Sequence, residues 1–346
     1  MMKNNVPKKE IPRAQNAQRP SVRDDAKAEK VRREFTLLIA QPKLAYFDNA
    51  STTQKPRSVI DAEPQFYATM NANVRRGMYS LSENATRAYE EVRQQVRKFV
   101  RARRVEEIIF TKGTTESINL VMQTWGRQNI RADDVILLSE MEHHANLVPW
   151  QQLAIQQHAE LRWIPVTDEG RLDVKMFPKL LDEKVKLVAI AAMSNVLGTI
   201  NPVKEIVKKS HAFGAKVLVD AAQIVAHAPI DVESWNADFV AFSAHKMYGP
   251  TGVGVLYAKR ELLEAMPPFL FGGDMILDVR KNHTEWNELP EKFEGGTPNI
   301  AGVIGLGAAI AYLKSLDWDW IQEREKLLTE KLLCVLQAVP GITLFG

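Results

Sequence analysis

Cysteine is nearly absent from this chain, which has Cys334 as its single thiol among 346 residues. One cysteine excludes a disulfide framework and indicates a reducing compartment, so we expect the protein in the cytoplasm. Long apolar runs are absent as well, because none approaches the roughly 20 residues that a membrane span requires. The first 30 residues have neither the apolar core of a signal peptide nor the acid-poor composition of a transit peptide. We therefore expect no membrane partner.

Excess charge of either sign is also scarce, since the formal net charge is +3 at pH 7. The charge is unevenly placed: residues 1–30 hold eight Lys or Arg against four acids, a net of +4 that leaves −1 for the remainder. This segment has few large apolar residues and cannot bury enough surface to offset the entropy of ordering. We predict a disordered basic arm over residues 1–30, and we interpret it as a solvated tail rather than a nucleic-acid tether.

Short apolar runs dominate the rest of the sequence, and stretches with apolar residues at helical spacing separate them. The runs that predict strands are 107–111, 135–139, 161–166, 187–193, 216–220, 238–243 and 253–258. The clearest helical stretches are 115–125, 204–213, 300–316 and 318–339, and apolar residues 342–345 predict the start of another strand. Strands that alternate with helices predict an α/β fold with a mainly parallel sheet covered on both faces.

Polar residues of unusual kinds follow the ends of these runs. They are Thr114 and Thr115, His143, Asn195, Asp220 with Gln223, and Ser243 with His245 and Lys246. Because ligands of parallel sheets bind at the carboxyl ends of the strands, we expect these side chains to share one site.

The stretch "TKGTTESINLV" joins a strand, through a glycine turn, to a helix. The first turn of a helix exposes free N–H groups at the positive end of the helix dipole, so it attracts anions. Thr114 and Thr115 add hydroxyl donors, and a phosphate group is the natural occupant. An ordinary threonine cap would give the same local pattern and stays open as the alternative.

Asp220 and Lys246 each stand at the end of a strand-like run. A buried carboxylate is costly unless it is paired, and the pyridinium nitrogen of pyridoxal phosphate is a cationic partner for it. A lysine in a dry site has a lowered pKa and can form a Schiff base with an aldehyde. Taken singly, Asp220 is more often a helix cap and Lys246 a surface turn residue. The succession of phosphate site, acid and lysine along the chain favours the cofactor interpretation.

The adjacent histidines His143 and His144 raise the question of a metal site. Zinc ligands are usually separated along the chain and converge in space, and no matching Cys or carboxylate pair accompanies these histidines. We therefore expect no metal, and we interpret His143 as an aromatic lid over a planar cofactor ring.

Eight stretches resemble, in order and spacing, the cysteine desulfurases of the class V aminotransferase superfamily, and within them the group II enzymes often called SufS. The stretches are "YFDNASTTQKP", "RRGMYSLSENAT", "GTTESINLV", "MEHHANLVPWQ", "SNVLGTINPV", "VLVDAAQ", "FSAHKMYGPTGVGVLY" and "FEGGTPN". The resemblance covers about residues 44–346. It implies pyridoxal-phosphate fold type I, a homodimer, and residues 31–44 as an N-terminal segment that joins the small domain. It further implies a cofactor-binding large domain over 45–298 and the start of an incomplete α/β small domain over 299–346.

The same resemblance implies roles for individual residues. Lys246 would bind pyridoxal phosphate covalently and act in catalysis with His143, which would stack on the ring. Asp220 would pair with the pyridine nitrogen, and Gln223 would donate to the phenolic oxygen. The phosphate would be held by Thr115, Ser243 and His245, with Thr297 reaching the phosphate of the partner subunit. Asn195 would help to hold the substrate carboxylate.

The implied reaction converts L-cysteine to L-alanine and passes persulfide sulfur to an acceptor protein of iron–sulfur cluster assembly. Selenocysteine is a possible second substrate. Another class V reaction, such as aminotransfer or selenocysteine β-elimination, stays open, as does a catalytically dead assembly subunit.

Some positions depart from the family pattern. Arg75 stands where histidine is common, Ser51 where alanine is common, and Ala222 and Ala244 where glycine is frequent. Family members also continue past residue 346 with a cysteine that attacks the substrate sulfur and an arginine that binds its carboxylate. Cys334 lies off the apolar stripe of its predicted helix, formed by Leu328, Leu332, Val335 and Val339, and we interpret it as a structural thiol. We therefore expect a truncated chain with impaired activity, or one whose missing part is supplied separately.

Overall fold

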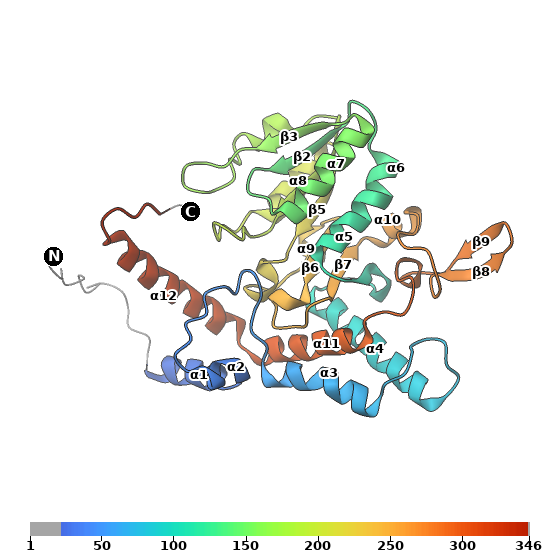
Figure 1. Cartoon of the computed structure of the whole chain (residues 1–346). Helices are drawn as coiled ribbons and strands as arrows, with labels where there is room; N and C mark the ends of the chain where they lie inside the picture. The colour runs from blue at the N-terminus through green and yellow to red at the C-terminus, as the bar shows by residue number, and fades with distance from the viewer. Residues whose placement is uncertain (1–21, 345–346) are drawn as a thin grey trace, which may run out of the picture.

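Seven strands form one sheet at the centre of the protein in a computed structural model that describes residues 22–344 (Figure 1). Its strands are β1 Ile108–Thr111, β2 Val135–Ser139, β3 Glu160–Ile164, β4 Val185–Ala191, β5 Lys216–Asp220, β6 Phe239–Ser243 and β7 Gly254–Ala258. They lie in the order β1-β7-β6-β5-β4-β2-β3. Strands β3, β2, β4, β5 and β6 pair in parallel, and β7 runs antiparallel to both β6 and β1. The predicted mainly parallel sheet is confirmed.

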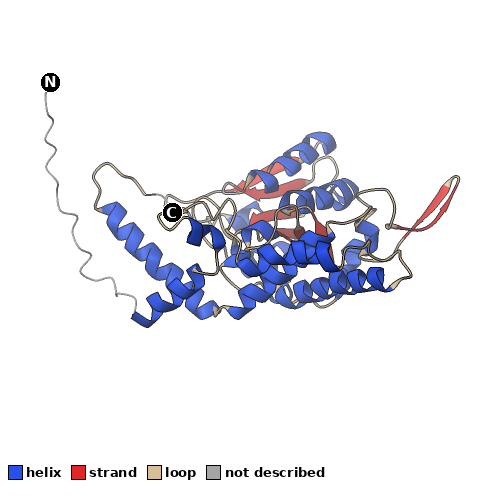
Figure 2. Ribbon diagram, turned by 60° about the horizontal axis from the view of Figure 1, so that its bottom comes forward, coloured by secondary structure: helices blue, strands red, loops and turns tan. Residues whose placement is uncertain are grey.

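Helices cover both faces of this sheet, which makes three layers (Figure 2). The helices are α1 Val22–Arg32, α2 Thr36–Ala40, α3 Arg57–Thr69, α4 Ser80–Phe99, α5 Thr114–Val121, α6 Arg127–Asn129, α7 Val148–Gln157, α8 Val203–Ala212, α9 Val232–Trp235, α10 Arg260–Ala265, α11 Ile300–Ser315 and α12 Trp318–Gln337. A π-helical turn, Met122–Gly126, joins α5 to α6. The remaining strands, β8 Ile276–Arg280 and β9 His283–Trp286, form a hairpin that stands away from the body (Figure 2).

Alternate residues of each strand pack into different layers, as a sheet buried on both faces requires. In β6, Phe239 and Ala241 join the core beneath α5 and α7, whereas Val240 and Phe242 join the core beneath α4, α8 and α11. This double burial explains why the strands are continuous apolar runs in the sequence. It also explains why the polar residues begin only where the strands end.

Gly254 begins β7 at the point where that strand crosses the glycine turn after β1. A Cβ at this position would lie 2.7 Å from the backbone N and C atoms of Gly113, which cannot move without displacing the turn. We expect Gly254→Ala to lower the free energy of unfolding by about 1–3 kcal/mol. The matched control is Gly272→Ala, whose Cβ would have no neighbour within 4 Å. Urea denaturation of both variants tests this, and equal stabilities would contradict the proposed close approach.

Two predictions about the ends of the described chain are wrong. Residues 22–30 belong to helix α1 rather than to a disordered arm, and residues 1–21 lie outside the described residues. The helix is held by distant partners in α12: Arg324 donates to Asp25 at 2.9 Å, and Lys27 lies 4.3 Å from the Trp320 ring centroid. Residues 342–344 form no strand, because no neighbouring strand among the described residues pairs with them.

Helix α11 packs against α3 and α4, and its buried residues belong to the same core as the sheet. The predicted domain boundaries at residues 44 and 298 are not tested by this arrangement and stay predictions. Within residues 22–344, no single helix is long and apolar enough to cross a membrane. Helices α11 and α12 meet that criterion only as a pair, bent by 80°.

Candidate active site

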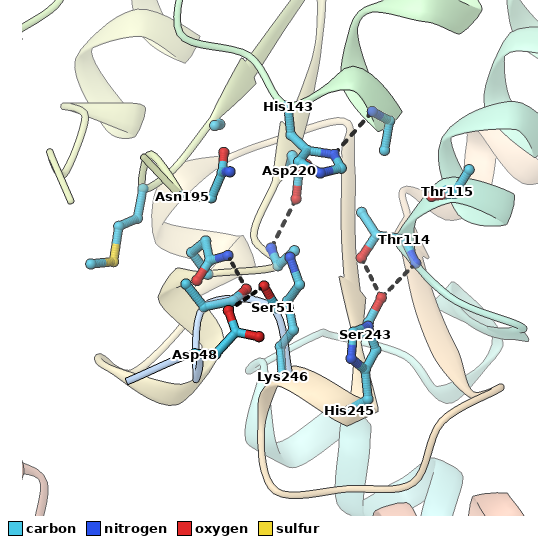
Figure 3. Close-up of a pocket in the computed structure, with 16 residues that line it drawn as sticks. Asp48, Ser51, Thr114, Thr115, His143, Asn195, Asp220, Ser243, His245 and Lys246 are labelled. Atoms are coloured by element: carbon cyan, nitrogen blue, oxygen red, sulfur yellow. Dashed lines mark hydrogen bonds between the residues drawn. The ribbon is translucent and has the colours of Figure 1, made fainter. Parts of the chain in front are cut away.

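A cavity of about 500 Å³ opens at the carboxyl ends of strands β1, β4, β5 and β6 (Figure 3). The predicted residues that line it are Thr114, Thr115, His143, Asn195, Asp220, Gln223, Ser243, His245 and Lys246. Thr297 does not line this cavity, but borders a separate one next to the edge strand β1. The topology therefore gathers all the predicted site residues except Thr297, which borders the second cavity.

The turn between β1 and α5 forms one wall of the cavity. Ser243 at the end of β6 accepts a hydrogen bond from the backbone N–H of Thr114 at 2.8 Å, and the two hydroxyl oxygens lie 2.7 Å apart. Thr115, the next residue of α5, is exposed to the cavity. Hydroxyl groups and the first N–H groups of a helix thus converge on one spot, which is a donor set suited to a phosphate.

Lys246 and Asp220 lie close enough for their charges to interact across the cavity. Figure 3 shows the Lys246 side chain rising from the end of β6 toward the wall that holds Asp220. Burial lowers the pKa of Lys246 and raises the pKa of Asp220, although each charge partly offsets the effect of burial on the other. The backbone N–H of Ala222 donates to Asp220 at 2.9 Å and fixes the carboxylate. The cavity thus brings an amine with a lowered pKa beside a buried carboxyl group that a cationic partner would hold in its charged form.

His143 stands over the cavity on the loop after β2. Its Nδ1 accepts a hydrogen bond from the Ala145 N–H at 3.0 Å, which leaves Nε2 to carry the proton of a neutral ring. Burial, followed by the charge of Lys246, lowers the pKa of His143. A neutral imidazole ring at the mouth of the cavity is suited to stacking on a flat ring and to moving a proton.

Sequence reasoning overlooked the loop of residues 48–51, of which Asp48, Ala50 and Ser51 line the cavity. The Gln223 amide donates to the Ala50 carbonyl at 2.8 Å, and the Ser51 hydroxyl donates to Asp48 at 2.7 Å. One N–H of the Gln223 amide remains for a ligand, as its predicted role requires. The motif "YFDNASTTQKP" was the available signal, because it contains this whole loop.

Lys55 is a second lysine beside the site that the sequence did not single out. Its ammonium donates to the carbonyls of Thr53 and His245, and burial lowers its pKa to about 8. It therefore holds the backbone next to Lys246 without lining the cavity itself. Its sequence context, a loop before a proline, carries no signal for this contact.

Glu142 is a buried carboxyl group beneath the cavity and was also overlooked as a site residue. Its oxygens accept hydrogen bonds from the Ser139 hydroxyl, from the Asn146 amide at 2.7 Å and from the Ala191 N–H at 2.8 Å. It thereby joins the loop that carries His143 to strand β4. Burial raises the pKa of Glu142 to about 8, with Asp220 adding to the rise.

The raised pKa of Glu142 makes the stability of the cofactor-free protein depend on pH. In the folded state Glu142 keeps its proton up to about pH 8, whereas in the unfolded chain it loses the proton near pH 4.5. The contribution of Glu142 to the free energy of unfolding is therefore largest below about pH 4.5 and falls as the pH rises from 4.5 to 8. The slope from this group is up to about 1.4 kcal/mol per pH unit. We expect Glu142→Gln to remove that part of the slope in denaturation measured at pH 5.5 and 8. A variant with the wild-type slope would show that Glu142 is ionised when folded.

Cys334 is exposed on α12 and does not line the cavity. The predicted apolar stripe beside it is exposed too, with Leu328 at 49% and Leu332 at 53%. Our interpretation of Cys334 as a structural thiol assumed that the apolar stripe of α12 is buried. That assumption is wrong, because the stripe is exposed. Within the described residues, no group of three or more His, Cys, Asp or Glu side chains could hold a metal ion.

The cavity fits pyridoxal phosphate by the chemistry of its donors. The α5 turn with Ser243 offers hydroxyl and N–H donors for the phosphate, Asp220 offers a buried anion for the ring nitrogen, and Lys246 offers an amine for the aldehyde. The three groups come from three strand ends of one sheet. Capping of helix α5 would explain the hydroxyl and N–H donors of its first turn, but not the positions of Asp220 and Lys246.

Comparison with known proteins agrees with this chemistry. The family model described as aminotransferase class-V matches residues 45–346. A cysteine desulfurase of Escherichia coli O7:K1 is 49% identical over 322 residues, which span 92% of this chain and 79% of that protein. One of Shigella flexneri has the same identity and coverage.

Solved structures show the same relationship. The cysteine desulfurase CsdA of Escherichia coli, in an S-sulfonic acid form, superposes with a TM-score of 0.80 at 40% identity, covering 88% of this chain and 77% of the other. The apo cysteine desulfurase of Thermococcus onnurineus NA1 gives a TM-score of 0.84 at 41% identity, covering 88% and 75%. The predicted type I fold is confirmed by these superpositions.

Proposed function

Because this chain belongs to the class V aminotransferase family, we propose that its cavity is the active site of a pyridoxal-phosphate-dependent cysteine desulfurase. The observation that carries the proposal is the placement of the Lys246 amine beside the buried Asp220 carboxylate, in a cavity that also offers a phosphate site. The reaction converts L-cysteine to L-alanine and transfers the sulfur to a thiol acceptor.

Lys246 would bind the cofactor covalently and would also carry the proton taken from the substrate Cα. Pyridoxal phosphate, when bound, supplies an electron sink for the electron pair left at the substrate Cα. The Lys246 amine would remove the Cα proton and later return it, and its lowered pKa favours that exchange. Its position at the end of β6 keeps the amine at the cavity floor.

Asp220 and His143 lie close enough for their charges to interact, and they would act on different parts of the cofactor. The Asp220 carboxylate, held by the Ala222 N–H, would keep a ring nitrogen protonated in a site from which water is largely excluded. His143 would cover the ring and exchange a proton through Nε2, because Nδ1 is occupied by Ala145. Asn195 lines the cavity (Figure 3), and its amide would donate to a substrate carboxylate.

Further parts of the proposal concern partners. We propose a homodimer in which Thr297 reaches the phosphate site of the other copy, and its exposure outside its own cavity supports that role. A sulfur acceptor of iron–sulfur cluster assembly and a cytoplasmic location complete the proposal, the latter supported by the scarcity of cysteine.

The proposal is tested by incubating the protein, loaded with pyridoxal phosphate, with L-cysteine and a thiol reductant. Alanine and sulfide should form in equal amounts, with the added thiol reductant accepting the sulfur and releasing it as sulfide. Formation of pyruvate, or of a product that needs an added keto acid, would instead indicate a different class V reaction. Bound cofactor with no product from any amino acid would indicate the catalytically inactive assembly subunit.

Cys334 provides a further prediction for the same assay. Since it does not line the cavity, we expect Cys334→Ser to bind the cofactor and turn over L-cysteine as the wild type does. Turnover lost in that variant alone, with the cofactor still bound, would identify Cys334 as the thiol that receives the sulfur.

A further inference from the structure

A cluster of charged residues, with Arg93 and Glu294 buried and Arg75 and Glu90 partly buried, lies beside the edge strand β1 and outside the cavity. It consists of Arg75 in the loop before α4, Glu90 and Arg93 in α4, and Glu294 in the loop before α11, and we refer to it as the edge cluster. The Arg93 side chain is 0% exposed and that of Glu294 is 2% exposed. Charges so deeply buried are strongly destabilising unless every one is paired.

The ion pair of Arg93 and Glu294 closes the open edge of the sheet. Arg93 Nη1 donates to the Ile108 carbonyl at 2.8 Å, and the Phe110 N–H donates to Glu294 Oε1 at 2.8 Å. These are the β1 groups that a neighbouring strand would otherwise satisfy. Two side chains therefore substitute for a strand and tie β1 to the loop that contains Glu294.

Arg75 completes the pairing. Its Nη2 donates to Glu90 Oε1 at 2.7 Å and to Glu294 Oε2 at 3.1 Å. Its backbone has a φ of 68°, which is unusual for a residue with a side chain, and its N–H is held by Thr86 Oγ1 at 2.8 Å. Arg75, one of the positions where the sequence departs from the family pattern, thus places a guanidinium inside the cluster.

Two segments with predicted roles at a phosphate leave this cluster. Strand β1 leads from Phe110 directly into the turn that carries Thr114. The other segment runs from Glu294 through Thr297 to Asn299, whose Oδ1 accepts from the Gly302 N–H at 3.0 Å and whose Nδ2 donates to the Gly252 carbonyl at 3.2 Å. Thr297 is therefore exposed on a short segment that is anchored at both ends.

We infer that the edge cluster is a positioning device that fixes the Thr114 turn and the Thr297 segment relative to each other. This inference rests on the proposed function, in which each copy holds one phosphate through its own turn and reaches the partner's phosphate through Thr297. The cluster then couples the two half-sites of a dimer through one rigid group of ion pairs. Arg75 and Glu294 are positioning residues here, since neither lines the cavity.

The decisive variant is Arg75→Ala, because it removes one of the ion pairs that fix Glu294 and so loosens the edge closure, while the Arg93–Glu294 pair remains to keep the protein folded. We expect the rate at which pyridoxal phosphate dissociates from the holoenzyme to rise about tenfold, the effect of losing charged hydrogen bonds. Thr297→Ala should give a similar rise. The double variant should dissociate no faster than Thr297→Ala alone, because both changes remove the same contact.

The matched control is Arg162→Ala at the opposite edge of the sheet. Arg162 in β3 also pairs with two carboxylates, Glu160 at 2.8 Å and Asp182 at 2.6 Å. The Arg162→Ala variant should leave the rate of cofactor dissociation unchanged. An Arg162→Ala effect equal to that of Arg75→Ala, or additive effects of Arg75→Ala and Thr297→Ala, would overturn the inference and indicate a general loss of stability.

Hydrogen exchange of the cofactor-free protein gives an independent readout. In Arg75→Ala, peptides covering residues 108–115 and 293–299 should both exchange about tenfold faster, with the rest of the sheet unchanged. Unchanged exchange in both peptides would overturn the inference even if the wild type binds cofactor. A wild type that binds no pyridoxal phosphate, with both peptides accelerated in Arg75→Ala, would refute the proposed function but retain the coupling of the two segments.

Discussion

Replacing Lys246 with alanine should lower the rate of alanine formation from L-cysteine by roughly 10⁴-fold, since no other amine in the cavity can move the Cα proton. The variant should also lose the visible absorption of covalently held pyridoxal phosphate, while the phosphate donors of the α5 turn still bind the free cofactor. Steady-state kinetics and absorption spectra of the purified holoenzyme measure both effects.

Lys55→Ala is the matched control for this experiment. Lys55 is also a partly buried lysine with a lowered pKa, and it contacts the carbonyl of His245, but its amine does not line the cavity. The control should keep the cofactor covalently bound. Covalent cofactor that persists in Lys246→Ala and disappears in Lys55→Ala would reverse the assignment of the two lysines.

Replacing Asp220 with asparagine should lower turnover by roughly 10²–10³-fold, the effect of removing one preorganised electrostatic partner. Asparagine retains an oxygen for the Ala222 N–H, so the local backbone is preserved and only the charge is removed. Cofactor binding should weaken much less than turnover. Measurement of kcat together with the cofactor dissociation constant separates the two effects.

Asp238→Asn is the corresponding control at the opposite end of β6. Asp238 is fully buried, and His211, Lys259 and Lys216 surround it far from the cavity. Loss of this charge should cost stability, on the order of 3 kcal/mol, without changing turnover per folded molecule. If Asp220→Asn also lost only stability, its carboxylate would have no part in the chemistry.

The strands and the location of the site could be predicted because both follow from burial. A strand covered on both faces, such as β6, appears in the sequence as an uninterrupted apolar run, and its carboxyl end is marked by the first polar residue, Ser243. Parallel pairing then brings Asp220 and Lys246 to one edge. No contact between distant residues needs to be known for this reasoning.

Charged residues whose partners are distant in sequence could not be placed in this way. Arg93 and Glu294 look like surface residues in the sequence, yet their pairing buries both. Helix α1 has the composition of a disordered segment, and its contact between Asp25 and Arg324 joins residues nearly 300 positions apart. In each case a residue distant in sequence supplies the opposite charge, and the local sequence gives no sign of it.

The central claim is that Lys246 holds pyridoxal phosphate, and reduction with borohydride tests it most directly. The reagent would fix the covalent link, and peptide mass spectrometry would locate it. We predict the mass of the reduced cofactor on the peptide that contains Lys246, and its absence from the peptide that contains Lys55. Cofactor found on any other lysine, or on none in a folded protein saturated with pyridoxal phosphate, would contradict the account.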